Sequence, residues 1–141
     1  MLAKQIVITI FRTLLLIKIM EGNKEIKSLY YDTPSYVTFY NRTTRNVAIL
    51  WHDYKGKLVR YAIIKPGAVH NMNTYVTHPW SVVDSDTGDR LLIDNSFVFY
   101  PRTQNQEDDS NPNFERIHID VPVYPLLIRS LQVVKKLVPL D

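Results

Sequence analysis

From Ser35 onward, short runs rich in β-branched and aromatic residues alternate with polar turn sequences. Such runs suit a pleated strand with one face buried. Lys65-Pro66-Gly67 is a strong turn signal, because proline presets one backbone dihedral and glycine tolerates positive φ. Short strands separated by turns at these intervals predict an all-β fold, a β-sandwich. The runs expected to form strands are 36–41, 46–51, 57–64, 68–75, 80–84, 90–94, 96–100 and 116–121.

The pattern changes near the C-terminus, where residues 126–138 contain neither glycine nor proline. On a helical wheel their apolar residues cover one wide arc, and most polar residues lie opposite. We therefore expect a C-terminal α-helix that ends before Pro139. Its apolar arc is wider than packing on a sandwich edge requires, which favours docking to a partner protein. The alternative is that the helix packs wholly on the sandwich or against the N-terminal segment.

The N-terminal segment, residues 1–27, is harder to assign. Residues 6–20 are apolar, but Arg12 and Lys18 interrupt them, and a membrane span needs about 20 apolar residues. A signal peptide could use Lys4 as its basic region, yet no small-x-small cleavage site precedes Glu21. The other interpretations are that translation begins at Met20, or that the segment is an extra strand or helix. We thus expect a leader at 1–27, a sandwich at 28–122 and a helix at 123–141.

Composition excludes several classes of function. The 141 residues include no cysteine, which rules out disulfides, thiolate zinc sites and a cysteine nucleophile, and fits a reducing compartment. The net charge of +3 resides in the first 19 residues, so the remainder has a formal charge of zero and no basic stripe for nucleic acid. The four histidines show no zinc-ligand spacing, and no nucleophile elbow is present. We expect no enzyme, no metal, no cofactor and no membrane.

The segment Thr74–Trp80 is the most informative candidate site. It places a hydroxyl, two aromatic rings and the imidazole of His78 within seven residues, where a strand runs into a tight loop. Such a cluster can wall an apolar slot and aim a hydroxyl and an imidazole at one polar atom of a ligand. The alternative is that Trp51 and Trp80 are ordinary core and the tyrosines ordinary strand residues. A second alternative pairs His78 with Asp84 in a small hydrolase.

A larger set of residues, taken in order and spacing, resembles the von Hippel–Lindau family of ubiquitin-ligase substrate receptors. The resemblance covers residues 35–138, and no single motif within it is decisive. Its carriers are Val37, Phe39, Tyr40, Asn41, Arg42, Arg45, Trp51, Gly56, Tyr61, Pro66, Gly67, Tyr75, His78, Trp80, Asp84, Leu91, Leu92, Pro122, Val123, Tyr124, Leu126, Arg129 and 131–134.

The resemblance implies a binding site for 4-hydroxyproline in the α-subunit of hypoxia-inducible factor. His78 matches the imidazole that bonds the 4-hydroxyl, and Thr74 stands where the family has serine. If plain proline entered, these polar atoms would lose both water and partner, at about 1–3 kcal/mol each. The segment before Ser35 departs from the family at Tyr30 and Asp32. The hydroxyproline-binding residues implied are Trp51, Tyr61, Thr74, Tyr75, His78 and Trp80.

The resemblance also implies that the C-terminal helix docks to elongin C, which assembles with elongin B. Ser130 stands where the family's docking box has cysteine, and serine is the more polar of the two. The sequence ends at Asp141, before the family's later helices, so contact with the cullin scaffold is doubtful. The alternative is a hydroxyproline-binding module without ligase coupling. The cytoplasm and nucleus are the expected locations. The elongin C-binding residues implied are Leu126, Arg129, Ser130 and Val134.

Overall fold

The computed structural model describes residues 2–20, 25–108 and 110–123. Backbone contacts divide the chain into two units: one contains the helix α1 (Leu2–Met20) and the other spans Ile26–Pro122. Each unit is treated by itself. The helix predicted over 126–138, with its four proposed elongin contacts, lies outside the described residues.

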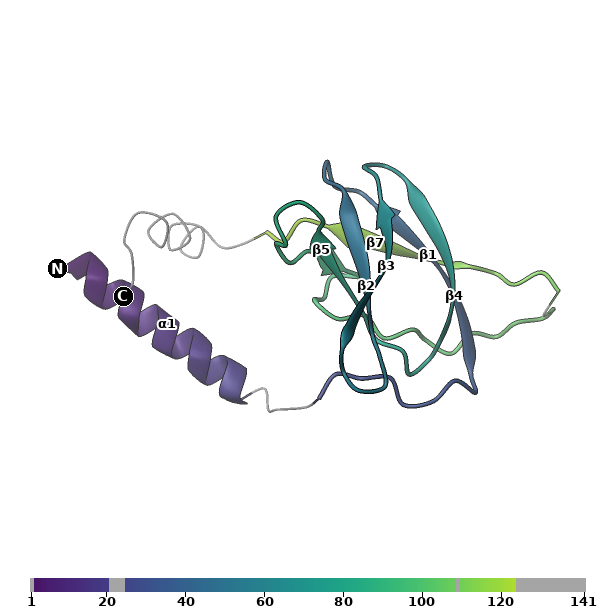
Figure 1. The fold of residues 1–141 in the computed structure, drawn as a ribbon, viewed down its shortest axis with the longest axis horizontal. Coiled ribbons are helices and arrows are strands. Elements are labelled where there is room, and N and C mark those ends of the chain that lie inside the picture. Colours follow the sequence, from purple (N-terminus) through teal and green to yellow (C-terminus); the bar gives the residue numbers. More distant parts are fainter. Residues whose placement is uncertain (1, 21–24, 109, 124–141) are drawn as a thin grey trace. The chain divides into compact units, whose positions relative to one another are not determined.

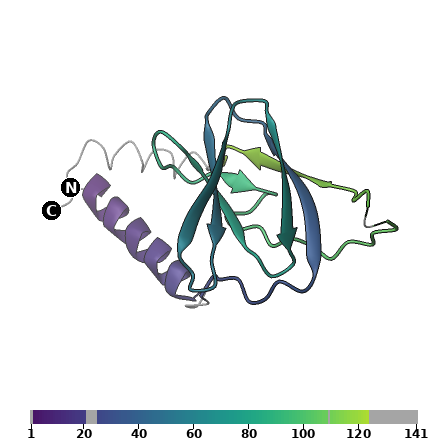
Figure 2. The same ribbon diagram turned by 45° about the vertical axis from the view of Figure 1, so that its right-hand side comes forward.

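The unit from Ile26 to Pro122 is a sandwich of two sheets, which confirms the mainly-β prediction (Figures 1 and 2). Strand order is β4-β1-β7-β6 in one sheet and β3-β2-β5 in the other. β1 runs antiparallel to β4 and parallel to β7. The strands are β1 (Pro34–Asn41), β2 (Val47–His52), β3 (Leu58–Ile64), β4 (Val69–Tyr75), β5 (Trp80–Asp84), β6 (Leu92–Ile93) and β7 (Glu115–Asp120).

Alternation along the strands builds the core between the two sheets. In β1 every second residue is buried, from Ser35 to Asn41, as expected when one face of a strand packs inward. Phe39 lies at the centre, with its ring 5.8 Å from that of Trp80 and 6.3 Å from that of Phe99. The buried apolar cluster is Val37, Phe39, Val47, Ile49, Ile64, Met72, Trp80, Val82, Leu91, Ile93, Phe99, Ile117 and Ile119.

The strand predicted over 96–100 is wrong, and the one predicted over 90–94 shortens to β6. Asp94 and Asn95 both have positive φ (52° and 59°), so the chain reverses there and Ser96 forms only an isolated bridge with Ile93. Phe99 instead exchanges two backbone hydrogen bonds with Trp80, of 2.9 and 2.8 Å. The segment therefore runs from the edge strand β6 of one sheet to the edge strand β5 of the other, and it pairs with each through isolated bridges.

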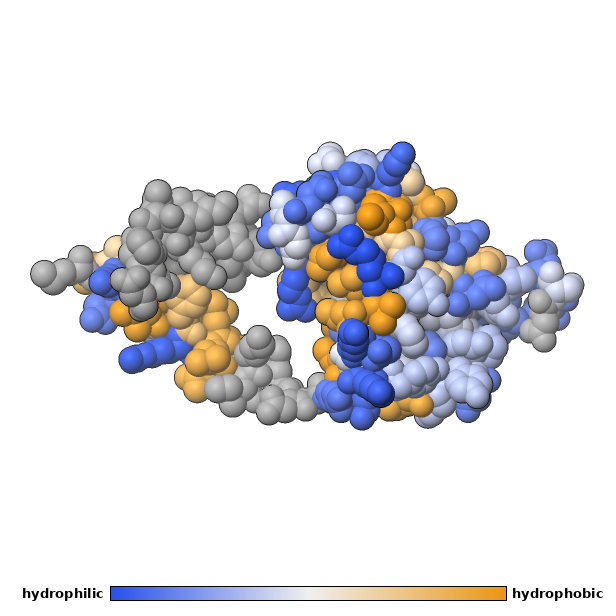
Figure 3. Space-filling view, viewed as in Figure 1, coloured by the Kyte–Doolittle hydropathy of each residue, from blue (hydrophilic) through white to orange (hydrophobic). Residues whose placement is uncertain are grey.

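The N-terminal segment forms α1, one of the interpretations left open. Several of its apolar side chains are exposed, among them Leu15 and Leu16 (Figure 3). Thr9 and Thr13 donate their hydroxyls to carbonyls four residues earlier, which satisfies these polar groups within the helix. Within the described range, no helix combines the length and apolar content that a membrane crossing requires.

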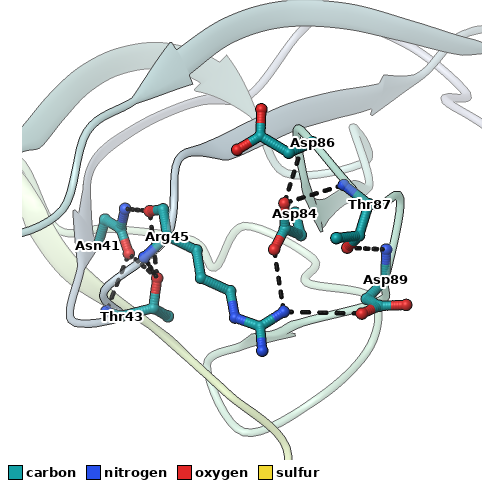
Figure 4. Close-up of polar contacts among 7 residues, drawn as sticks. All are labelled: Asn41, Thr43, Arg45, Asp84, Asp86, Thr87 and Asp89. Carbon is teal, nitrogen blue, oxygen red and sulfur yellow. Dashed lines mark hydrogen bonds and ion pairs between the residues drawn. The ribbon is translucent and has the colours of Figure 1, made fainter.

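Asn41 closes the end of β1 with a fully satisfied side chain. Its amide donates to the carbonyl of Arg45 (2.7 Å) and to that of Ile64 (3.0 Å). Its oxygen accepts from the backbone N–H and the hydroxyl of Thr43 (2.9 and 2.7 Å). Because the residue is fully buried, these four bonds fix the turn after β1 against β3 (Figure 4).

The same turn reaches β5 through an ion pair. Arg45 lies 3.0 Å from the carboxylate of Asp84, which also accepts the backbone N–H groups of Asp86 and Thr87 (Figure 4). The bond from Asp86 is the largest cause that lowers the pKa of Asp84. Asp84 ends β5 and His78 precedes its start, about 13 Å or more away along the strand, so these two residues do not form the hydrolase pair.

Candidate functional site

The structure brings together all six residues that the resemblance assigned to a hydroxyproline site. They come from three strands of one sheet, the end of β4 in the other sheet, and the turn that joins β4 to β5. In that turn the backbone N–H of His78 donates to the carbonyl of Tyr75 (3.0 Å), which holds the imidazole close to the strand end. The six are Trp51 in β2, Tyr61 in β3, Thr74 and Tyr75 in β4, His78 in the turn and Trp80 in β5.

A β-bulge places Tyr61 in this cluster. Along β3, Arg60 pairs with Leu50 and Ala62 pairs with Ile49, so Tyr61 is an extra residue without a partner in β2. A bulge bends the strand and re-aims a side chain. Tyr61 packs edge-on against Trp80, with ring centroids 5.3 Å apart, although it remains 56% exposed.

Aromatic contacts connect the cluster without interruption. The indole of Trp51 stacks on the imidazole of His78 at 5.4 Å and an interplanar angle of 29°. Trp51 also meets Tyr61 edge-on at 6.3 Å, and Tyr75 meets His78 at 5.0 Å. Edge-to-face and offset contacts of this kind stabilise beyond the area they bury. The rings therefore form one continuous wall.

The two polar groups expected to detect a hydroxyl already have protein partners. Trp80 Nε1–H donates to Thr74 Oγ1 at 2.9 Å, and Thr74 is 3% exposed. His78 Nε2 lies 3.1 Å from the hydroxyl of Tyr54. Each side chain therefore has a protein hydrogen bond, and plain proline would deprive it only of the further bond that a ligand hydroxyl supplies.

The environment of His78 favours its neutral form. His78 is 7% exposed. Burial lowers the pKa of its imidazole most, and the Tyr30 backbone raises that pKa by a smaller amount. Burial disfavours the charged form of a histidine. At neutral pH the ring therefore offers one N–H donor and one acceptor nitrogen.

Sequence reasoning missed two residues that support the walls. Tyr54 belongs to the turn between β2 and β3, where the sequence indicated only a break. Ser28 is 2% exposed and bridges two groups: it accepts from Trp51 Nε1 (2.8 Å) and donates to the carbonyl of His52 (2.6 Å). Neither residue belongs to a spacing pattern, so only the proximity of Tyr54 to Trp51 in sequence could have indicated one of them.

The segment from Ile26 to Thr33 contacts the turn that joins β4 to β5. Thr77 Oγ1 donates to the carbonyl of Tyr30 (2.7 Å) and accepts its N–H (3.1 Å). Val76 N–H donates to the carbonyl of Thr33 (3.0 Å). These three hydrogen bonds therefore hold the turn that carries His78, and Tyr30 remains 52% exposed.

Two packed sheets with an aromatic cluster at their edge make this unit a β-sandwich domain. The VHL beta domain is the family that matches, over residues 26–107, more than half of the chain. The chain belongs to the VHL family.

Protein Vhl of Drosophila melanogaster is similar to this chain, with 32% identity over 66 residues. The aligned part is 47% of the chain and 37% of that relative, so the chain matches little more than a third of the relative's length.

Proposed function

We propose that this chain is a substrate receptor that binds 4-hydroxyproline in peptides of hypoxia-inducible factor α and directs them to a cullin-RING ubiquitin ligase. The observation that carries the proposal is the continuous wall of Trp51, Tyr61 and Trp80 beside Thr74 and His78. A pyrrolidine ring gains from burial among such rings. The receptor itself would catalyse nothing, and it would work in the cytoplasm and nucleus.

The position of β4 supports binding of an extended peptide. Among the described strands, β4 pairs with β1 and lies at the edge of its sheet, so its outer side presents unpaired backbone groups. Thr74 and Tyr75 end this strand at the aromatic cluster. A peptide that adds to β4 would therefore run into the cluster, with main-chain bonds for affinity and the ring cluster for specificity.

The selectivity for hydroxyproline over proline depends on the hydrogen bonds that Thr74 and His78 can still form with a ligand hydroxyl. Thr74 Oγ1 accepts from Trp80, but its own O–H remains available to a ligand hydroxyl. One hydrogen bond contributes about 1 kcal/mol, so two ligand bonds together give a preference of about thirtyfold. Because Thr74 and His78 already have protein partners, the preference for hydroxyproline over proline should be smaller than in a site whose two polar groups have no other partner.

Calorimetry with a hydroxylated peptide and its plain-proline twin tests the pocket. We expect at least about tenfold tighter binding of the hydroxylated peptide, and His78→Ala should remove most of the difference. His118→Ala removes an imidazole from β7 and is the matched control. Equal affinities of the two peptides for the wild type would refute the pocket assignment.

Coupling to the ligase would use the helix predicted over 126–138. Leu126, Ser130 and Val134 recur at four-residue intervals and would share one helix face toward elongin C, with Arg129 beside them. Ser130→Cys restores the family's docking residue and should strengthen binding of the elongin C–elongin B complex by about 1 kcal/mol. Leu126→Asp should abolish it without affecting the hydroxylated peptide.

A titration of the elongin complex separates the receptor from its alternative. Binding by the wild type, strengthened by Ser130→Cys, supports a ligase receptor. If the wild type does not bind and Ser130→Cys gains nothing, the chain is better described as a binding module that shields hydroxylated peptides. The peptide measurements are independent of this outcome.

A further inference from the structure

Tyr54 contacts the aromatic cluster, and the proposed function gives it no role. It lies in the β2–β3 turn, and its hydroxyl is 3.1 Å from His78 Nε2. Its ring meets both Trp51 (5.7 Å) and His78 (5.4 Å) edge-on, each at 87°. These contacts fix the phenol beside the stacked pair of Trp51 and His78, yet the residue is 44% exposed and contributes little to the core.

The donor and acceptor roles in the site can be assigned in order, starting from Trp80. An indole N–H can only donate, so Thr74 Oγ1 must accept from it and can use its own proton for a further bond. A hydroxyl that receives the proton of Thr74 keeps its own proton to donate. The only imidazole atom that can receive this proton is an unprotonated ring nitrogen of neutral His78.

The far side of His78 fits an N–H donor at Nε2. Nε2 lies against the hydroxyl of Tyr54, which leaves Nδ1 as the ring nitrogen for a ligand. A tyrosine hydroxyl can also accept, so Nε2–H can donate to Tyr54. Nδ1 then carries the lone pair. Each group from Trp80 through Thr74, the ligand hydroxyl and His78 then donates to the next, ending at Tyr54. Hydrogen bonds in such a chain strengthen one another.

We propose that Tyr54 is a positioning residue that fixes His78 as its Nε2–H tautomer, so that Nδ1 accepts the proton of a ligand hydroxyl. This inference rests on the proposed function and deepens it. The site would then require a hydroxyl that both accepts from Thr74 and donates to His78. A ring substituent that accepts but has no proton, such as fluorine at the same carbon, would satisfy only half of the site.

The first test needs no ligand. Long-range proton–nitrogen NMR correlations of the histidine rings report which nitrogen is protonated. In the wild type, His78 should show a protonated Nε2 and an unprotonated Nδ1. Tyr54→Phe, which keeps the ring and removes the hydroxyl, should shift His78 toward a mixture of tautomers. Tyr31→Phe removes a neighbouring phenol that packs on Tyr75, and should leave the tautomer unchanged.

The second test compares peptides that differ only at C4 of the proline. We expect Tyr54→Phe to weaken the 4-hydroxyproline peptide about three- to tenfold, the effect of one hydrogen bond. The 4-fluoroproline peptide of the same configuration should bind wild type and Tyr54→Phe equally. A purely structural role would instead lower the affinity for all peptides together and reduce the thermal midpoint of the free protein.

The outcomes separate the two proposals. If the wild type does not prefer the hydroxylated peptide over plain proline, the proposed function fails, and this inference fails with it. If the preference is present but wild-type His78 is protonated at Nδ1, the role of Tyr54 is refuted alone. An unchanged affinity for the hydroxylated peptide in Tyr54→Phe refutes it equally.

Discussion

The substitution Ser28→Ala tests how much the hydroxyl that anchors Trp51 contributes to the stability of the domain. Ser28 is 2% exposed and lies before β1, outside every strand. Its hydroxyl accepts from Trp51 Nε1 at 2.8 Å and donates to the carbonyl of His52 at 2.6 Å. Its backbone N–H donates to the carbonyl of Asp53 at 3.1 Å, and alanine retains that bond.

The cost can be worked out from the two bonds that are lost. The carbonyl belongs to His52, which is 8% exposed, and leaving such a group without a partner costs about 1–3 kcal/mol. The indole of Trp51 is only half-buried, so water can partly replace its partner, and we assign it about 0.5–1 kcal/mol. We therefore expect Ser28→Ala to lower the free energy of unfolding by about 1.5–4 kcal/mol.

Urea unfolding of wild type, Ser28→Ala, Trp51→Phe and the double mutant measures this effect and its origin. If the indole bond matters, the two single changes should be coupled by about 0.5–1 kcal/mol in the double-mutant cycle. Ser28→Ala should also weaken the hydroxylated peptide, because the Trp51 ring loses its anchor. A cost below about 0.5 kcal/mol together with strict additivity would refute the reasoning.

Further expectations concern stability. Asn41→Asp puts a carboxylate oxygen in place of an amide that donates to two carbonyls, so urea unfolding should show a loss of at least about 3 kcal/mol. Backbone N–H groups and Arg45 lower the folded pKa of Asp84, so its stabilisation is present above the unfolded pKa and is lost as pH falls through the folded value. The difference in unfolding free energy between wild type and Asp84→Asn should accordingly shrink in acid, and a constant difference would contradict the assignment. Deletion of residues 1–19 should leave the thermal midpoint and peptide binding of the sandwich unchanged, because the main buried cluster extends only from Val37 to Ile119.

Local sequence was sufficient where one strand face alternates or a turn is strongly encoded. The alternation of β1 and the Pro66-Gly67 turn predicted the first strands with small errors at their ends, and β5 was predicted with the bounds observed. Side-chain alternation follows from strand geometry alone, so it is visible in sequence before any partner is known. The resemblance supplied the six site residues, which composition and spacing could not have assigned to hydroxyproline.

Pairing and proximity were decided only by the tertiary structure. Residues 96–100 have the composition of a strand, but a strand also needs a neighbour, and Phe99 finds one only at Trp80. Tyr61 enters the site through a bulge, which depends on the register of β3 against β2. Tyr54 and Ser28 lie in turn and loop sequence, where no periodicity constrains a side chain. Their contacts with His78 and Trp51 arise because the folded sheets bring distant segments within hydrogen-bond distance, and no local pattern encodes that distance.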